Sequence, residues 1–133
     1  MTAAEPGSPP IVVERNEILL PGPAAALAGL LDVADPGLEA GGRLPMLWHW
    51  LYTLDRPPRK DLGTDGHPVR GALPAPPEPG RRRMWAGGRV TTHAPLHAHV
   101  PVRRHTRLLA EVTKEGRTGT LTFATVLHEI SQD

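Results

Sequence analysis

The sequence predicts a single α+β domain in which helices cover one face of an antiparallel β-sheet. A chain of 133 residues has the length of one domain. Apolar residues recur at helical spacing in the first half of the chain and alternate with polar residues in the last third. The 16 prolines and 14 glycines, set against five aromatic residues, indicate a turn-rich chain with little to bury.

Composition excludes several classes of function. The 15 Lys and Arg residues nearly balance the 14 Asp and Glu residues, which disfavours a dedicated nucleic-acid binder. The chain has no cysteine, so it has no disulfide, thiolate metal site or cysteine nucleophile. The longest apolar stretch, residues 44–54, is shorter than the roughly 20 residues that cross a bilayer, and no signal peptide is recognisable. We therefore expect a cytoplasmic protein with no membrane or nucleic-acid partner.

The N-terminal part should hold a strand followed by a helix. Residues 1–10 are small, polar and proline-rich and are expected to form a flexible leader, which leaves residues 11–133 for the domain. Residues 11–20 are expected to form a strand. The helix should begin at Pro21 and Pro23 and end at the Asp-Pro-Gly of residues 35–37. Its apolar positions, spaced i, i+3, i+4 and i+7, are Leu27, Leu30, Leu31 and Ala34.

Residues 45–54, with the sequence PMLWHWLYTL, predict a buried central helix. The segment opens with a proline, as many helices do, and apolar side chains cover nearly all of its faces. Three of the five aromatic residues lie within it. We therefore expect the sheet to wrap around this helix.

The rest of the chain should hold one long loop and the sheet. Residues 55–83, rich in proline, glycine and charge, are expected to form a mobile or functional loop. Strands are predicted at residues 89–96, 105–114 and 120–130, with a hairpin loop at residues 115–119. One antiparallel sheet curled around one buried helix is the hotdog architecture.

Five segments also resemble a known family. They are LPMLWHWLYTL, LGTDGHPVRGALP, RRRMWAGGR, TTHAPL and EVTKEGRTGTLTFATVLHEI. In this order, over residues 13–130, they resemble the N-terminal hotdog half of the mesaconyl-CoA and itaconyl-CoA hydratases and of the type 2 3-hydroxyacyl-thioester dehydratases. Proteins of that family usually have twice this length, with a MaoC-like second hotdog domain. The resemblance implies (R)-specific hydration of an enoyl thioester, or the reverse dehydration.

The resemblance also implies which residues should act as acid and base. MaoC-like domains use an Asp and a His five positions later, and none of the six aspartates of this chain has a His at that spacing. The family's His-Arg-x-His-Tyr-Asp run is absent too. We therefore predict no catalytic residue in this chain. Its expected role is that of a non-catalytic subunit that pairs with a MaoC-like catalytic hotdog subunit.

Two sets of residues are candidates for substrate contact. Arg81, Arg82 and Arg83 suit the phosphates of coenzyme A or of a carrier protein's phosphopantetheine, because guanidinium groups bind phosphate bidentately. A solvated surface is the alternative for this run of charge. The residues expected to contact the acyl thioester, with core or turn roles as the alternative, are His49, Trp50, Met84, Trp85, Gly87 and Gly88.

Two histidine patterns invite other chemistry. Asp65 and His67 suit an acid/base pair, although Asp-Gly at this position is also a turn dipeptide. Four histidines suggest zinc, but without a carboxylate or Cys at ligand spacing we predict no metal; they are His93, His97, His99 and His105. We expect no cofactor beyond the coenzyme A or phosphopantetheine that carries the substrate.

Two other functions remain open from the sequence. One is an acyl-binding or scaffolding hotdog module without catalysis. The other is a homodimeric hotdog enzyme, such as a thioesterase, that relies on His49 or His67.

Overall fold

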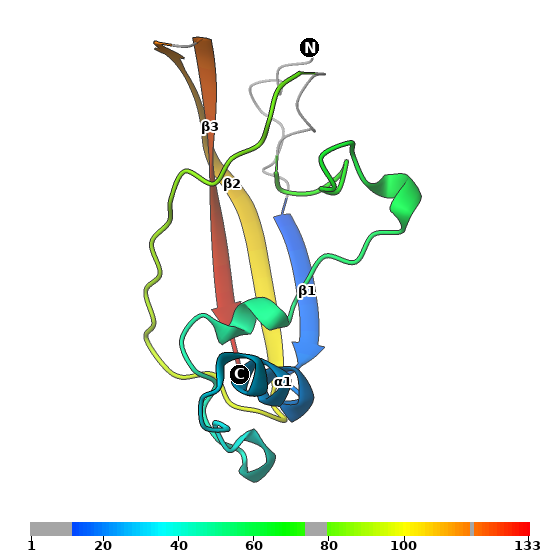
Figure 1. Ribbon diagram of the computed structural model, residues 1–133, viewed down its shortest axis with the longest axis vertical. Helices are drawn as coiled ribbons and strands as arrows, with labels where there is room; N and C mark the ends of the chain where they lie inside the picture. The colour runs from blue at the N-terminus through cyan, green and yellow to red at the C-terminus, as the bar shows by residue number, and fades with distance from the viewer. Residues whose placement is uncertain (1–11, 74–79, 118) are drawn as a thin grey trace. The chain divides into compact units, whose positions relative to one another are not determined.

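The computed structural model of the chain describes residues 12–73, 80–117 and 119–133 (Figure 1). Three strands form one antiparallel sheet in the order β1-β2-β3. The elements are β1 (Val12–Ile18), α1 (Pro21–Leu31), 3₁₀ turns at Leu38–Ala40, Trp48–Leu51 and Arg59–Asp61, β2 (Pro101–Gly116) and β3 (Gly119–Ser131). The α+β class is confirmed, and one helix with an antiparallel sheet is consistent with a single hotdog domain.

The chain divides into two compact units. One contains Pro57–Met84 and His105–His128, together with the start of β1. The other contains Glu14–Arg56, Trp85–Arg104 and Glu129–Asp133. Strands β2 and β3 each contribute residues to both units.

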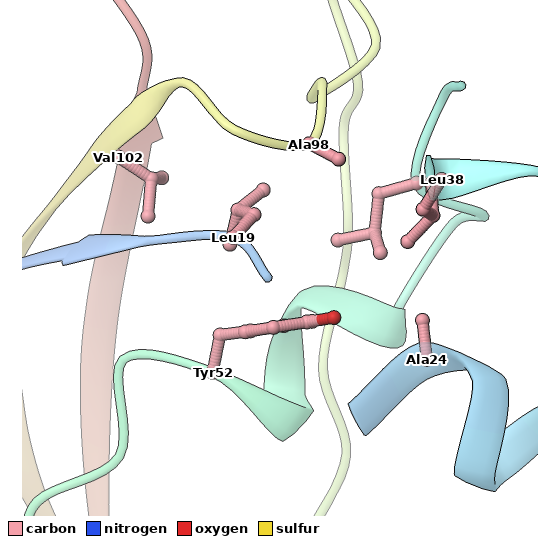
Figure 2. Packing of buried hydrophobic residues seen from close by; sticks show 7 residues of the cluster. Leu19, Ala24, Leu38, Tyr52, Ala98 and Val102 are labelled. Atoms are coloured by element: carbon pink, nitrogen blue, oxygen red, sulfur yellow. The ribbon is translucent and has the colours of Figure 1, made fainter. Parts of the chain in front are cut away.

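The second unit has a small apolar core (Figure 2). Its buried members are Leu19, Ala24, Leu38, Leu44, Tyr52, Ala98 and Val102. Tyr52 donates its hydroxyl hydrogen to the Leu20 carbonyl, with 2.6 Å between the oxygens. Only one of the five aromatic residues is among these buried members, in keeping with a chain that has little to bury.

Helix α1 begins at the predicted prolines but buries a different face from the expected one. Leu30 is 80% exposed, and Leu31 is exposed as well. The buried positions, spaced i, i+3 and i+7, are Pro21, Ala24 and Ala28. These residues also share one side of a helix, and their small side chains allow its backbone to lie close to the core. Of the predicted leucines, Leu27 is half-buried, and Leu30 and Leu31 are left on the surface.

The helix predicted over residues 45–54 does not form. A 3₁₀ turn spans Trp48–Leu51 instead, and none of its residues is fully buried. Leu47 precedes the turn with φ 71°, a left-handed conformation that no α-helix contains. Trp48 and Leu51 pack against the core, whereas Trp50 is exposed. The expectation of a buried central helix at this segment is therefore wrong, and the α-helix that the structure describes is α1.

The strand predictions have a mixed outcome. The first strand and the C-terminal hairpin are confirmed by β1, β2 and β3. Residues 89–96 form no strand, and this prediction is wrong. That segment is attached by an isolated bridge between Arg43 and His97, beside which the Leu44 N–H donates to the Leu96 carbonyl. The predicted leader, residues 1–10, lies outside the described residues.

The loop of residues 55–83 has little regular structure where it is described. It contains the 3₁₀ turn Arg59–Asp61 and an isolated bridge between Leu62 and Pro68. Across the described part of the chain, no helix has the length and apolar character needed to cross a membrane.

Candidate functional site

An exposed aromatic cluster lies in the second unit. The rings of Trp50 and Trp85 meet edge to face, with centroids 6.4 Å apart and planes at 75°. The His49 ring meets Trp50 in the same way, at 6.0 Å and 78°. This geometry is the one that aromatic quadrupoles favour. The structure thus joins three predicted substrate-contact residues, which we call the aromatic cluster (His49, Trp50 and Trp85).

Local backbone geometry positions the aromatic cluster. Trp48 and Leu51 pack inward from the 3₁₀ turn, which leaves Trp50 on the outside and 56% exposed. A Cβ atom on Gly88 would lie 2.9 Å from Cζ2 of Trp85, closer than van der Waals contact allows. A larger residue at position 88 would clash with the Trp85 indole where it lies, so the glycine allows this close contact.

The core alternative is wrong for two of the candidates. Trp85 is 77% exposed, and Met84 is exposed too. Gly87 has φ 139°, a backbone conformation that other residues rarely adopt, although residues 81–92 form no turn, helix or strand. An indole that lies on the surface and is held by another ring offers an apolar face to a ligand or partner.

A pocket in the first unit collects the predicted phosphate ligands. It has a volume of about 330 Å³. We call it the arginine pocket, and it is lined by Thr64, Asp65, His67, Arg81, Arg82 and Arg83. It therefore unites the arginine run with the Asp-Gly-His segment, which the sequence did not connect.

Asp65 is the most constrained group of the arginine pocket. Its Oδ2 lies 2.9 Å from Nε of Arg83, and the two side chains are only 16% and 23% exposed. Its Oδ1 accepts the backbone N–H of His67 at 3.1 Å, across a turn in which Gly66 has φ 78°. Nδ1 of His67 lies 3.5 Å from Oδ2. The turn alternative for this segment is confirmed.

These contacts decide the protonation of Asp65. The His67 N–H lowers its pKa most; burial opposes this, and the charge of Arg83 adds to the lowering. A carboxyl group with a lowered pKa is ionised at neutral pH and is a weak base. The geometry therefore gives no support to Asp65 and His67 as an acid/base pair.

The arginine pocket carries net positive charge. Among the described residues that line it, three guanidinium groups and one carboxylate leave two net positive charges, with His67 counted as neutral. Arg81 and Arg82 are exposed, and neither has a hydrogen bond or ion pair with another residue in the described ranges. Such a pocket suits an anion with planar or tetrahedral oxygens.

The histidine-rich segment is held by a residue that the sequence analysis missed. Oε1 of Gln132 accepts the His97 N–H at 2.7 Å, and Nε2 donates to the carbonyls of His97 and Val100 at 2.8 and 3.1 Å. A single glutamine near the chain end carries no sequence signal for this role.

In the parts of the chain that are described, no three potential metal ligands converge.

The aromatic cluster and the arginine pocket both lie in the part of the chain that matches a known protein family. Residues 47–133, which include the aromatic cluster and the arginine pocket, match the family model hydroxyacyl-thioester dehydratase type 2. The chain is also 43% identical over 109 residues to the mesaconyl-C(4)-CoA hydratase of Chloroflexus aurantiacus. That match covers 82% of this chain and 39% of the relative, so the chain spans about two fifths of the length of the relative.

Proposed function

Because the chain belongs to the hydroxyacyl-thioester dehydratase type 2 family, we propose that it is the non-catalytic, substrate-shaping subunit of a heteromeric acyl-thioester hydratase or dehydratase. The assembly adds water (R)-specifically to an enoyl thioester or removes it from a 3-hydroxyacyl thioester. A MaoC-like hotdog subunit supplies the Asp and His. This chain supplies part of the acyl tunnel and contacts to the coenzyme A or carrier portion.

One observation carries the proposal. The Asp and His side chains that meet in the arginine pocket are held in a turn, and the carboxylate is paired with Arg83. Hydration needs a base that takes a proton from water and an acid that protonates the α-carbon. A carboxylate kept ionised, first by the His67 N–H and also by Arg83, is suited to neither role, so both groups are expected from another subunit.

The aromatic cluster has a direct part in this function. Trp50 and Trp85 expose large apolar rings in the isolated chain. An acyl chain laid against these rings loses its contact with water, which stabilises the complex by about 25 cal/mol for each Å² of apolar surface removed. The cluster thereby orients the acyl group while the partner's acid and base act on its double bond.

The reaction itself balances as a simple addition. The partner's base removes a proton from water, the oxygen bonds to the β-carbon, and the electron pair of the double bond moves toward the thioester carbonyl. N–H donors hold the resulting enolate charge until the acid protonates the α-carbon. Dehydration runs through the same steps in reverse.

The test combines the chain with a MaoC-like hotdog chain encoded beside its gene. We expect the mixture to elute as one complex and to hydrate crotonyl-CoA or mesaconyl-C4-CoA, followed as loss of the enoyl thioester. The chain alone should leave both substrates unchanged, as should a mixture whose partner carries Asn in place of its catalytic Asp. Hydration by the chain alone at an enzyme-like rate would overturn the proposal.

The same samples separate the remaining functions. An acyl-binding module without catalysis would bind acyl-CoA and stay inactive in the mixture. A thioesterase would release free coenzyme A thiol, and that release would fall in the His49→Ala or His67→Ala variant. Neither outcome is expected if a partner supplies the catalytic residues.

A further inference from the structure

The three arginines of the arginine pocket are not equivalent. Arg83 pairs with Asp65 across 2.9 Å and is largely shielded from solvent. Arg81 and Arg82 line the same pocket, are exposed, and have no ion pair or hydrogen bond to any other residue that the structure describes. The Arg83 guanidinium thus makes a contact within the protein, whereas those of Arg81 and Arg82 face the pocket and the solvent.

We propose that Arg81 and Arg82 bind a phosphate group in this pocket, and that Arg83 is a positioning residue that acts through its ion pair with Asp65. The ligand class is the phosphorylated end of an acyl thioester. That end is a phosphate of coenzyme A or the phosphate of phosphopantetheine. The identity of this carrier rests on the proposed function, whereas the phosphate chemistry rests on the arginine pocket alone.

Charge neutralisation explains how an anion site can include Asp65. A carboxylate at the wall of an anion site repels the anion unless a cation neutralises it. Nε of Arg83 does this at 2.9 Å, and the His67 N–H also donates to the same carboxylate. Arg81 and Arg82 then contribute two positive charges that no carboxylate among the described residues cancels, and these match a phosphate that carries about −1.5 to −2 at neutral pH.

The pair also controls where the arginine run lies. Residues 81–84 belong to no helix or strand, so their backbone is not held by a ladder of hydrogen bonds. The Arg83–Asp65 contact ties this run to the turn at residues 65–67. Loss of either partner should therefore weaken phosphate binding by displacing Arg81 and Arg82.

The first experiment measures, by titration calorimetry, the affinity of the 133-residue chain for four probes. The probes are coenzyme A, 3′-dephospho-coenzyme A, 4′-phosphopantetheine and pantetheine. We expect pantetheine to bind about tenfold or more weakly than the best phosphorylated probe, the effect of losing one charge-assisted hydrogen bond. Equal affinity for all four probes, or no binding of any, would overturn the proposal.

The ranking of the phosphorylated probes identifies the source of the phosphate. Coenzyme A that binds about tenfold more tightly than its 3′-dephospho form places the 3′-phosphate in the pocket. Equal affinity for coenzyme A and phosphopantetheine places the pantetheine phosphate there, which a carrier protein also presents. Both results support the proposal and differ only in the carrier.

Variants test the division of roles. Arg81→Ala and Arg82→Ala should each weaken the phosphorylated probes about tenfold and leave pantetheine unchanged. Arg70→Ala is the matched control, because Arg70 is an exposed arginine of the same loop that does not line the pocket. An equal loss in Arg70→Ala would show a general charge effect and contradict the proposal.

A double-mutant cycle tests the positioning role. Arg83→Ala and Asp65→Asn should each weaken phosphate binding, and the double variant should bind no more weakly than Arg83→Ala, because the pair acts as one unit. Arg83→Lys should restore part of the affinity by keeping the charge beside Asp65. Additive losses would make Arg83 a direct ligand and overturn its assigned role. Thermal melting verifies that each variant is folded.

Failure of this inference differs from failure of the proposed function. A mixture with the MaoC-like partner that hydrates acyl-pantetheine as well as acyl-CoA would contradict the phosphate site and leave the function standing. Phosphate binding by the chain, with no hydration by any mixture, would contradict the proposed function and leave the phosphate site standing.

Discussion

Tyr52 joins the end of the aromatic-rich segment to the start of α1, because its hydroxyl donates to the Leu20 carbonyl at 2.6 Å. Leu20 is the residue that precedes the helix, and Tyr52 belongs to the apolar core. Burial raises the pKa of Tyr52, so the phenol remains a donor over the neutral range. One side chain thus contributes both a core ring and an anchor for the helix.

This relationship predicts the result of removing one oxygen. Tyr52→Phe should lower the free energy of unfolding by about 1 kcal/mol, because the ring stays packed while the Leu20 carbonyl loses the hydrogen bond from the phenol. Tyr52→Ala should lower it by about 3–5 kcal/mol, since a cavity replaces the ring. Urea unfolding measures both. A Tyr52→Phe variant as stable as the original would contradict the assigned hydrogen bond.

The contact between Gly88 and Trp85 leads to a prediction about binding. The added Cβ of Gly88→Ala would lie 2.9 Å from the indole, so the ring must move and loosen its contact with Trp50. Because Trp85 is exposed, stability should change by less than about 0.5 kcal/mol. Tryptophan fluorescence should shift, and acyl-CoA should bind several-fold more weakly.

A second glycine provides the control. Gly29 lies within α1, and a Cβ atom there would meet nothing within 4 Å. Gly29→Ala should stabilise the chain by about 0.5–1 kcal/mol through helix propensity and leave the fluorescence unchanged. An identical spectral shift in both variants would mean that the Trp85 environment does not depend on Gly88.

The strand pattern was predictable because its causes are local. In the hairpin, Thr106, Leu108, Ala110 and Val112 alternate with polar residues, and β2 and β3 form around that alternation. In residues 45–54 only some of the apolar residues are buried: Tyr52 lies in the core, and Trp48 and Leu51 pack against it. Leu47 adopts a left-handed conformation, and Trp50 remains exposed. The helix propensity of this segment is overridden by the left-handed backbone at Leu47, which the local sequence pattern does not predict.

The site was predictable residue by residue and not as an arrangement. Arg81, Arg82 and Arg83 follow from the phosphate chemistry of arginine, and Trp50 and Trp85 from their place in segments that resemble the family. The contact of Arg83 with Asp65 and that of Trp50 with Trp85 depend on loop conformations far apart in sequence. Gln132 contributes three hydrogen bonds that its sequence neighbourhood does not indicate.

The lowered pKa of Asp65 predicts how stability depends on pH. Because its pKa is lower in the folded chain than in the unfolded one, Asp65 stabilises the fold above the unfolded value, which is about 4. This contribution is lost as the pH falls through the folded value, where the carboxylate takes up a proton. The free energy of unfolding of Asp65→Asn should therefore fall below that of the original chain near neutral pH and converge with it in acid. A difference that grows in acid would contradict a lowered pKa of Asp65 in the folded chain.

Gln132 provides the sharpest test of how the histidine-rich segment is held. Gln132→Ala removes one acceptor and two donors from the backbone of residues 97–100, and should lower the free energy of unfolding by about 1–3 kcal/mol. Gln132→Glu should cost at least as much, because a carboxylate cannot donate and would lie against two carbonyl oxygens. The neighbouring Asp133→Ala is the control, since its contact with Arg103 is exposed and spans 3.8 Å, and it should change stability by less than about 0.5 kcal/mol. If Gln132→Glu were as stable as the original chain, the two donated hydrogen bonds could not be what holds the segment.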